Sequence, residues 1–495
     1  MTSRAFRRTR VAVAVGAASL SLAAGQALGA AFGLQTQNAS GLGHAYAGGA
    51  AAAEDVSTIF YNPAGLVRLH STQAVVSGNL ICPSIKFHDN GSQAALFQPL
   101  GTTNGDAGSC TVVPNGYLGI PFTDKWSFGI GVNVPFGLET EYSSDWLGRF
   151  QGVKSKIETI NINPVLSWEP TPHLTVGGGF SWQRVKANLT QQLNYAALFA
   201  QGVGKLVAAG QLPAANAPVV IGSAAGLESS ADISGNDNSW GWNVGVLWQA
   251  NDQTRFGAAY RSRVKYDVRG SANFTNPTAA SLGPLPSPLV PAAGLIVAGT
   301  NGTICGGTVA PLTPNLGGGC SQDVSLSVKM PDVANVSVFH QFNNRWDLMA
   351  DLQWTGWSSI QDLTVVRSTG EVLENLPEHF RNTWRVSAGA NYRYSDQWIF
   401  RGGLAYDQTP VRNEFRSPRL PDNSRTWFAA GVQYRISPNW SIDLAYAYEY
   451  MHDPSINNNG GNLSDPAATA ANGLISGSYK TGVNIVGLQV TYTAK

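Results

Sequence analysis

Apolar and polar residues alternate strictly along several long segments of this chain, and this period of two constrains the fold more than any other feature. The segment 440–450 places Trp, Ile, Leu and Tyr at every second position, with Ser, Asp, Ala and Glu between them. The segments 126–134, 346–355 and 384–394 repeat the pattern. Successive side chains of a β-strand point to opposite faces. Each segment therefore predicts a strand with one apolar face and one polar or small-residue face.

A soluble β-sandwich also alternates, so the lengths of the strands and of their connections have to decide between a soluble and a membrane protein. The segments are about ten residues or longer, enough to cross a bilayer at a steep tilt. Tight turns alternate with long connections, among them 191–228, 273–320 and 451–478. Outer-membrane barrels combine short periplasmic turns with long extracellular loops in this way. Trp follows directly after several tight turns, as in an interfacial aromatic girdle.

The alternating segments add up to about 14 strands, an even number, as expected for a closed barrel with both ends in the periplasm. Lipid offers no partner to a bare N–H or C=O group, so an open sheet edge in the membrane is costly. The high glycine content of the chain, 55 residues, fits the lumen face, where inward-pointing groups have little room. The predicted fold is all-β: a 14-stranded antiparallel transmembrane β-barrel over residues 72–495.

Residues 1–30 have the pattern of a secretory signal peptide. Four arginines precede an apolar, Ala-rich stretch that ends in small residues suitable for cleavage. The alternative is a signal anchor that remains as a transmembrane helix. No later stretch of about 18 apolar residues predicts such a helix. The net charge of +1 gives no electrostatic reason to expect a nucleic-acid partner.

Residues 31–71 do not follow the strand pattern. They are rich in Gly and Ala and contain an Asn-Pro pair, which marks a turn or helix boundary. The segment is either a plug inside the lumen or a disordered periplasmic tail, and its apolar content argues against free disorder.

Three parts of this segment carry a recognisable pattern: 40–48 (SGLGHAYAG), 54–55 (ED) and 62–66 (NPAGL). They resemble the N-terminal hatch of the FadL family of long-chain fatty acid transporters. Blocks further along the chain follow in family order and span nearly the whole mature sequence: 135–142, 161–164, 352–357, 400–410 and 420–425. The resemblance implies a barrel closed by an N-terminal hatch, with hydrophobic substrates captured between extracellular loops and passed to a tighter site inside.

The resemblance also implies that the hatch shifts and that an inward kink in the third strand opens a lateral path through the wall. Proline within a strand removes a ladder hydrogen bond, so we place the kink at Asn133, Pro135 and Gly137. The alternative is a strand that simply ends in its extracellular loop. Gating is assigned to hatch residues, whose alternative role is that of ordinary turn and cap residues: Gly41, Gly43, Asp55, Asn62, Pro63 and Ala64.

Two sets of residues are candidates for binding the substrate. Leu198, Phe199, Val203 and Leu206 fall near one helical face of a long loop, and exposed apolar patches often mark ligand grooves. The alternative is that this loop and the apolar loop after it pack together as a lid. Arg184 and Arg381 occupy positions where the resemblance suggests basic ligands for a carboxylate, although lumen arginines more often pair with lumen carboxylates.

The four cysteines predict two disulfides, Cys82–Cys110 and Cys305–Cys320, because each pair brackets or lies within one extracellular connection outside the reducing cytoplasm. Their spacing does not suit a zinc site, and no metal or cofactor is expected. Fragments spelled like penicillin-binding motifs, 262–265 and 480–482, fall on predicted strands and lack the required context. The chain is therefore interpreted as a non-enzyme.

The leading functional hypothesis is passive, hatch-gated uptake of long-chain fatty acids across the outer membrane of a Gram-negative bacterium. The alternatives are uptake of aromatic or aliphatic hydrocarbons and, from another class, a surface receptor or adhesin whose lumen stays shut. The expected partners are a hydrophobic small molecule, outer-membrane lipid and lipopolysaccharide, with a monomer as the assembly state.

Overall fold

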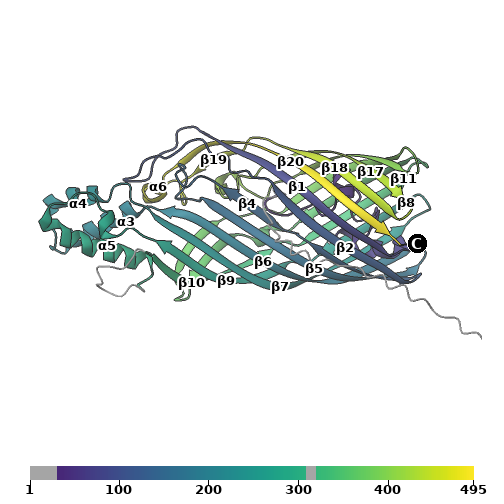
Figure 1. The fold of residues 1–495 in the computed structure, drawn as a ribbon, viewed down its shortest axis with the longest axis horizontal. Coiled ribbons are helices and arrows are strands. Elements are labelled where there is room, and N and C mark those ends of the chain that lie inside the picture. The colour runs from purple at the N-terminus through teal and green to yellow at the C-terminus, as the bar shows by residue number, and fades with distance from the viewer. Residues whose placement is uncertain (1–29, 308–318, 495) are drawn as a thin grey trace, which may run out of the picture.

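The computed structural model describes residues 30–307 and 319–494, so the predicted signal segment lies outside the described residues except for its last position. All strands join one antiparallel sheet (Figure 1). The first strand, β1 (Gln73–Asp89), pairs with the last, β20 (Ile475–Thr493), along its full length and closes the sheet on itself. The protein is thus a closed 14-stranded antiparallel barrel, as the alternation predicted.

Several barrel strands consist of two segments separated by a short break: β3 with β4, β8 with β9, β10 with β11, β12 with β13, and β14 with β15. The bounds of the remaining segments are β2 (Thr111–Thr123), β3 (Trp126–Asn133), β4 (Gly137–Glu141), β5 (Lys154–Thr171), β6 (Leu174–Leu193), β7 (Ser229–Gln249), β8 (Thr254–Arg261), β9 (Val264–Thr275), β10 (Gly319–Met330), β11 (Val333–Gln341), β12 (Trp346–Thr355), β13 (Asp362–Arg367), β14 (Val372–Pro377), β15 (Thr383–Arg393), β16 (Trp398–Asp407), β17 (Arg425–Ser437), β18 (Trp440–Met451) and β19 (Ser455–Asn458).

The alternation of the sequence separates the two faces of the wall. In β18, Trp440, Leu444 and Tyr446 are exposed on the outside, whereas Asp443 and Glu449 are buried inside. Aromatic rings pair between neighbouring strands close to the tight turns, with centroids 4.5–5.3 Å apart: Trp126 with Trp168, Trp346 with Tyr392, Trp398 with Tyr434, and Trp440 with Tyr492. Within the described residues, no helix has the length and apolar character needed to cross a membrane.

The N-terminal segment is a folded plug inside the barrel, not a free tail. It contains α1 (Ala39–Leu42), α2 (Thr58–Tyr61) and the 3-10 helix η1 (Pro63–Leu69), and most of its residues are buried. Glycines of the wall make room for it. A Cβ atom added at Gly245 would lie 1.9 Å from the Asn62 side chain, and one at Gly403 would lie 2.3 Å from the backbone of His44. At further wall glycines an added Cβ atom would also lie within 3.0 Å of a hatch atom: Gly119, Gly129, Gly177, Gly257, Gly389, Gly431 and Gly487.

Helices gather beyond one end of the barrel, on the side of β6, β7, β9 and β10 (Figure 1). They are α3 (Tyr195–Ala208), α4 (Ala217–Ser223) and α5 (Val290–Ile304). A further short helix, α6 (Pro466–Asn472), lies in the connection before β20. The connections that carry these helices are the long ones, so this end is the extracellular side.

Candidate functional site

Asn62 and Asp55 attach the hatch to the barrel wall. The Asn62 amide donates hydrogen bonds to the carbonyl oxygens of Val246 in β7, at 3.0 Å, and of Ala50, at 2.6 Å. The Asp55 carboxylate accepts from the Gln489 amide of β20 at 2.9 Å and from the Ser40 hydroxyl at 2.7 Å. The hatch is therefore tied to two separate strands, and the gating role of these residues stays a prediction.

The other hatch residues named from the sequence serve close packing. A Cβ atom added at Gly43 would lie 3.1 Å from the Cα of Gly431, a tight contact. A Cβ atom at Gly41 would lie 2.5 Å from the Asn38 side chain, which caps α1. Pro63 and Ala64 begin η1 and press against Gly177 of β6, 2.5 Å from the position of a Cβ atom there.

Glu54 is a partly buried hatch carboxylate to which the sequence analysis gave no role. Its Oε2 lies 3.3 Å from His44 Nε2 and 3.7 Å from Arg401 Nε of β16, and the Asn391 amide donates to its Oε1. Burial disfavours the ionised carboxyl, but His44 and Arg401 outweigh this and hold the pKa of Glu54 below its ordinary value. The acidic pair Glu54-Asp55 in an Ala-rich segment was the available signal.

The third barrel strand is interrupted between Asn133 and Gly137. The ladder from β3 to β5 ends at Asn133, and the ladder from β4 to β5 resumes one residue out of step. The hatch segment 32–34 fills the interruption. The Leu34 N–H donates to the Pro135 carbonyl, and the Gly137 N–H donates to the Phe32 carbonyl, both at 2.9 Å. The hatch segment 32–34 thus takes the place of the missing strand segment in the barrel wall.

A small cavity separates the hatch from the wall beside this interruption. Its volume is about 70 Å³, room for a few ordered waters. Arg261 of β8 is the cation of this cavity. Its guanidinium donates to the Phe60 carbonyl at 2.8 Å and lies 4.3 Å from the centre of the Phe60 ring. Apolar and aromatic residues line much of the remainder: Leu34, Phe60, Tyr61, Phe136, Val333 and Trp357.

The expected lumen position of Arg184 is wrong. In β6 the buried, inward residues are Gln183 and Val185, so Arg184 faces outward with Phe180 and Trp182. Arg381 is exposed in the connection before β15, where its Nε donates to the Thr409 carbonyl at 3.2 Å. The structure does not bring these two arginines together.

Sequence reasoning missed Arg261, although the pattern contained a signal. Gly257 and Arg261 are four residues apart in β8, so both lie on the same, inward face of the strand. Gly257 packs on the hatch. Counting inward positions from the turn would have placed this arginine in the lumen. The alternation in β6 would likewise have placed Arg184 outside.

The apolar residues of α3 pack against the neighbouring helices. Phe199 and Val203 are fully buried in one cluster with Val220 of α4 and Ile296 of α5. Leu198 and Leu206 lie partly buried at the rim of the same cluster. The helices of the two loops therefore pack together, as the lid interpretation expected, and the role of the α3 residues in binding a substrate stays a prediction.

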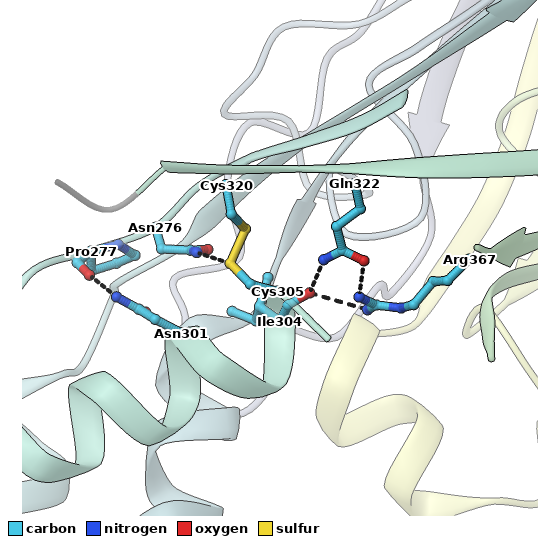
Figure 2. The surroundings of a disulfide bond; sticks show 8 residues. All are labelled: Asn276, Pro277, Asn301, Ile304, Cys305, Cys320, Gln322 and Arg367. Atoms are coloured by element: carbon cyan, nitrogen blue, oxygen red, sulfur yellow. Dashed lines mark hydrogen bonds between the residues drawn. A yellow bond between two sulfur atoms is a disulfide. The ribbon is translucent and has the colours of Figure 1, made fainter. Parts of the chain in front are cut away.

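Both predicted disulfides are present, Cys82–Cys110 and Cys305–Cys320. Figure 2 shows how the second joins the end of α5 to β10. Beside it, the Ile304 carbonyl accepts from the Arg367 guanidinium at 3.1 Å and from the Gln322 amide at 3.3 Å. The bond and these contacts fix one helix of the lid to the barrel. No cluster of metal-ligating side chains occurs in the described ranges.

Comparison with known proteins gives one consistent match. Residues 20–494 match the family described as "Outer membrane protein transport protein (OMPP1/FadL/TodX)". A long-chain fatty acid transport protein of Salmonella typhi is 29% identical, over 92% of this chain and 94% of the relative. A Pseudomonas aeruginosa FadL homologue of solved structure superposes with a TM-score of 0.77 at 27% identity, over 94% of this chain and 99% of the other. The Pseudomonas putida toluene transporter TodX shares the fold, with a TM-score of 0.62 at 18% identity, over 94% and 99%.

Proposed function

Because this chain belongs to the OMPP1/FadL/TodX family of outer membrane transport proteins, we propose that it takes up long-chain fatty acids passively through a hatch-gated barrel. The family consists of channels for hydrophobic compounds, so the chain is a transport protein and not an enzyme. The finer assignment to fatty acids is inferred from the lumen.

Arg261 is the observation that carries the proposal. A fatty acid has an apolar chain and one carboxylate, and an arginine can bind a carboxylate through two parallel hydrogen bonds. Arg261 forms no ion pair with any residue in the described part of the chain, and it faces a cavity lined by Phe60, Phe136 and Trp357. Burying the acyl chain there contributes roughly 0.8 kcal/mol per methylene, while the guanidinium fixes the charged end.

The path to this site requires the hatch to move. A cavity of about 70 Å³ is far too small for a long acyl chain, so binding has to displace Phe60, Tyr61 or the segment 32–34. Displacing 32–34 also removes the hydrogen bonds that fill the interruption in the third strand. We infer that the substrate enters past the lid, displaces this segment and leaves sideways between Asn133 and Gly137 into the membrane.

Uptake of aromatic or aliphatic hydrocarbons is the second candidate. It is favoured by the apolar rim of the lid at Leu198 and Leu206, which makes no demand on the charge of a ligand. A hydrocarbon has no charged group that Arg261 could bind in the inner cavity, so we prefer the fatty acid as substrate.

Binding of oleate and of oleyl alcohol to the purified protein separates these candidates, because the two ligands differ mainly in the charged group. Arg261→Gln is expected to weaken oleate binding about tenfold, the loss of one charge-assisted contact, and to leave oleyl alcohol nearly unchanged. Arg385→Gln is the matched control, since Arg385 also donates to a hatch carbonyl, that of Ala45, at 2.7 Å, but does not line the cavity. Equal loss for both ligands would assign Arg261 a merely structural role.

A further inference from the structure

The outer face of the barrel carries a polar hollow of about 820 Å³ between β5 and β10, far larger than the cavity under the hatch. Its residues lie on the parts of these strands that approach the lid (Figure 1). The polar side chains that matter here are Lys156, Lys186, Asn188, Asn236, Arg269 and Asp323.

The strand register aligns these side chains in a row across the wall. Lys186 of β6 is the direct partner of Asn236 in β7, and Asn236 is the partner of Arg269 in β9. Neighbouring strands lie about 4.8 Å apart, so the two cations stand roughly 10 Å apart with an amide between them. Arg184 lies on the same face of β6, two residues from Lys186. We call Arg184, Lys186 and Arg269 the outer cation patch.

Two carboxylates lie beside the outer cation patch, since Glu158 is the direct cross-strand neighbour of Lys186 and Asp267 is two residues from Arg269 on the same face. The carboxylates around the patch nevertheless mostly bind other side chains. Glu158 binds Lys156 at 2.8 Å, Asp267 binds Lys265 at 3.1 Å, and Asp232 accepts from the Asn188 amide at 2.6 Å. Asp323 lies across the hollow from Lys186 and lines it as well. In the described ranges, none of the three patch cations forms an ion pair, and Arg184 Nε is buried without a hydrogen-bond partner.

An aromatic belt begins immediately below the outer cation patch. The outward residues of β6 are, in order, Phe180, Trp182, Arg184 and Lys186. Phe180 and Trp240 of β7 are each 70% exposed, which is unusual for such large rings and suits contact with lipid chains. Along one strand, the surface therefore changes from aromatic to cationic within two residues, a rise of about 7 Å.

We propose that the outer cation patch binds the phosphorylated sugar headgroup of a lipid A-type glycolipid of the outer leaflet. Phosphate groups are bound by arginine and lysine through charge-assisted hydrogen bonds. Asn188 and Asn236 supply neutral donors and acceptors suited to sugar hydroxyls, and the acyl chains run down along Phe180 and Trp240. This site is on the opposite face of the wall from the lumen, so it is independent of the transported substrate.

Binding of bisphosphorylated lipid A to the purified full-length protein tests the site. The triple variant R184Q/K186Q/R269Q is expected to bind lipid A at least tenfold more weakly than the wild type. The control R345Q/R435Q/K480Q removes three exposed charges elsewhere and is expected to bind within twofold of the wild type. The charge-preserving variant R184K/K186R/R269K is expected to keep most of the affinity, which shows that a loss in the first variant reflects charge and not misfolding.

Two further ligands distinguish a lipid site from a general anion site. Dephosphorylated lipid A is expected to bind as weakly to the wild type as lipid A does to the triple variant, and millimolar inorganic phosphate is expected not to compete. Equal binding of lipid A by the triple variant and the wild type would overturn the proposal. Effective competition by phosphate alone would replace it with a site for free anions.

Discussion

Arginines inside the barrel divide into those with a carboxylate partner and those without. Arg401 binds Asp443 at 2.5 Å, and Arg425 binds Glu449 at 2.9 Å. A buried charge destabilises a protein unless it is paired and hydrogen-bonded, and both of these arginines are paired in this way. Arg261 is held only by a carbonyl, a hydroxyl and an aromatic ring, so a ligand carboxylate can still improve its environment.

Glu378, in the connection between β14 and β15, makes the stability of that connection depend on pH. Burial raises the pKa of this carboxyl to about 7, although Arg419 opposes the rise. The folded form therefore holds a proton that the unfolded form releases near pH 4.5, and stability is lost as the pH rises from about 4.5 to about 7. The protection factors of the amides at 378–382, which are the intrinsic exchange rates divided by the observed rates at the same pH, are expected to be at least about tenfold lower at pH 8 than at pH 5. Glu378→Gln should abolish the difference, and a persistent difference in that variant would contradict this origin.

Gly403 is expected to control how well the hatch seals the barrel. Gly403→Val places a side chain where a Cβ atom already lies 2.3 Å from the His44 backbone, so the hatch must shift. Cells with this variant should become more permeable to large hydrophobic antibiotics. The neighbour Gly402 has open space around its Cβ position and provides the matched control, Gly402→Val. Equal permeability of the two variants would show that the close approach at Gly403 does not hold the hatch.

The sequence predicted which residues face inward only where the alternation was followed through each strand. Glycines such as Gly245 and Gly403 lie on the lumen face against the hatch, where the pattern expected small residues, whereas others such as Gly402 have open space around them. Arg184 was misplaced because a family resemblance was given more weight than its position beside Gln183 and Val185. The partners of Glu54, in β15 and β16, are distant in the chain, and no local pattern reveals such contacts.

In the proposed route, lateral release depends on the interruption of the third strand. Gly33 and Phe136 face each other there as a narrow antiparallel pair, the kind with Cα atoms about 4.5 Å apart. This spacing is at the short end of the range for a disulfide. We therefore expect Gly33→Cys with Phe136→Cys to form a disulfide under oxidising conditions and to fix the segment 32–34 in place.

Oxidised cells carrying this double variant are expected to take up oleate at least tenfold more slowly than reduced cells. Each single cysteine variant controls for the loss of the Phe136 ring and for reduction of the two native disulfides. Unchanged uptake in the cross-linked protein would show that substrates leave by another route.

The sequence predicted the long strands and tight turns well but missed most of the breaks within strands. The break between β10 and β11 falls at Pro331-Asp332, where proline cannot donate to the ladder. Asp332 accepts from Arg263 Nε and from the Tyr260 hydroxyl, both at 2.8 Å. These partners belong to the adjacent strand, so the alternation within one segment could not reveal them.

The molecule as a whole is a barrel sealed at two levels. The hatch fills the lumen and is tied to β7 and β20, while the lid of α3, α4 and α5 covers the extracellular end on one side (Figure 1). Arg261 lies at the level of the hatch, and the partly buried Leu198 and Leu206 lie at the level of the lid. A molecule with a long apolar chain and one carboxylate matches both levels in turn.

Uptake of radiolabelled oleate by cells that lack their own fatty acid transporter tests this account most directly. Cells expressing this protein are expected to accumulate oleate well above cells with an empty vector, without an energy source for the transport step itself. Toluene uptake measured in the same cells provides the comparison. Uptake of toluene without oleate would contradict the fatty-acid assignment in favour of a hydrocarbon channel, and uptake of neither would point to a receptor whose lumen stays shut.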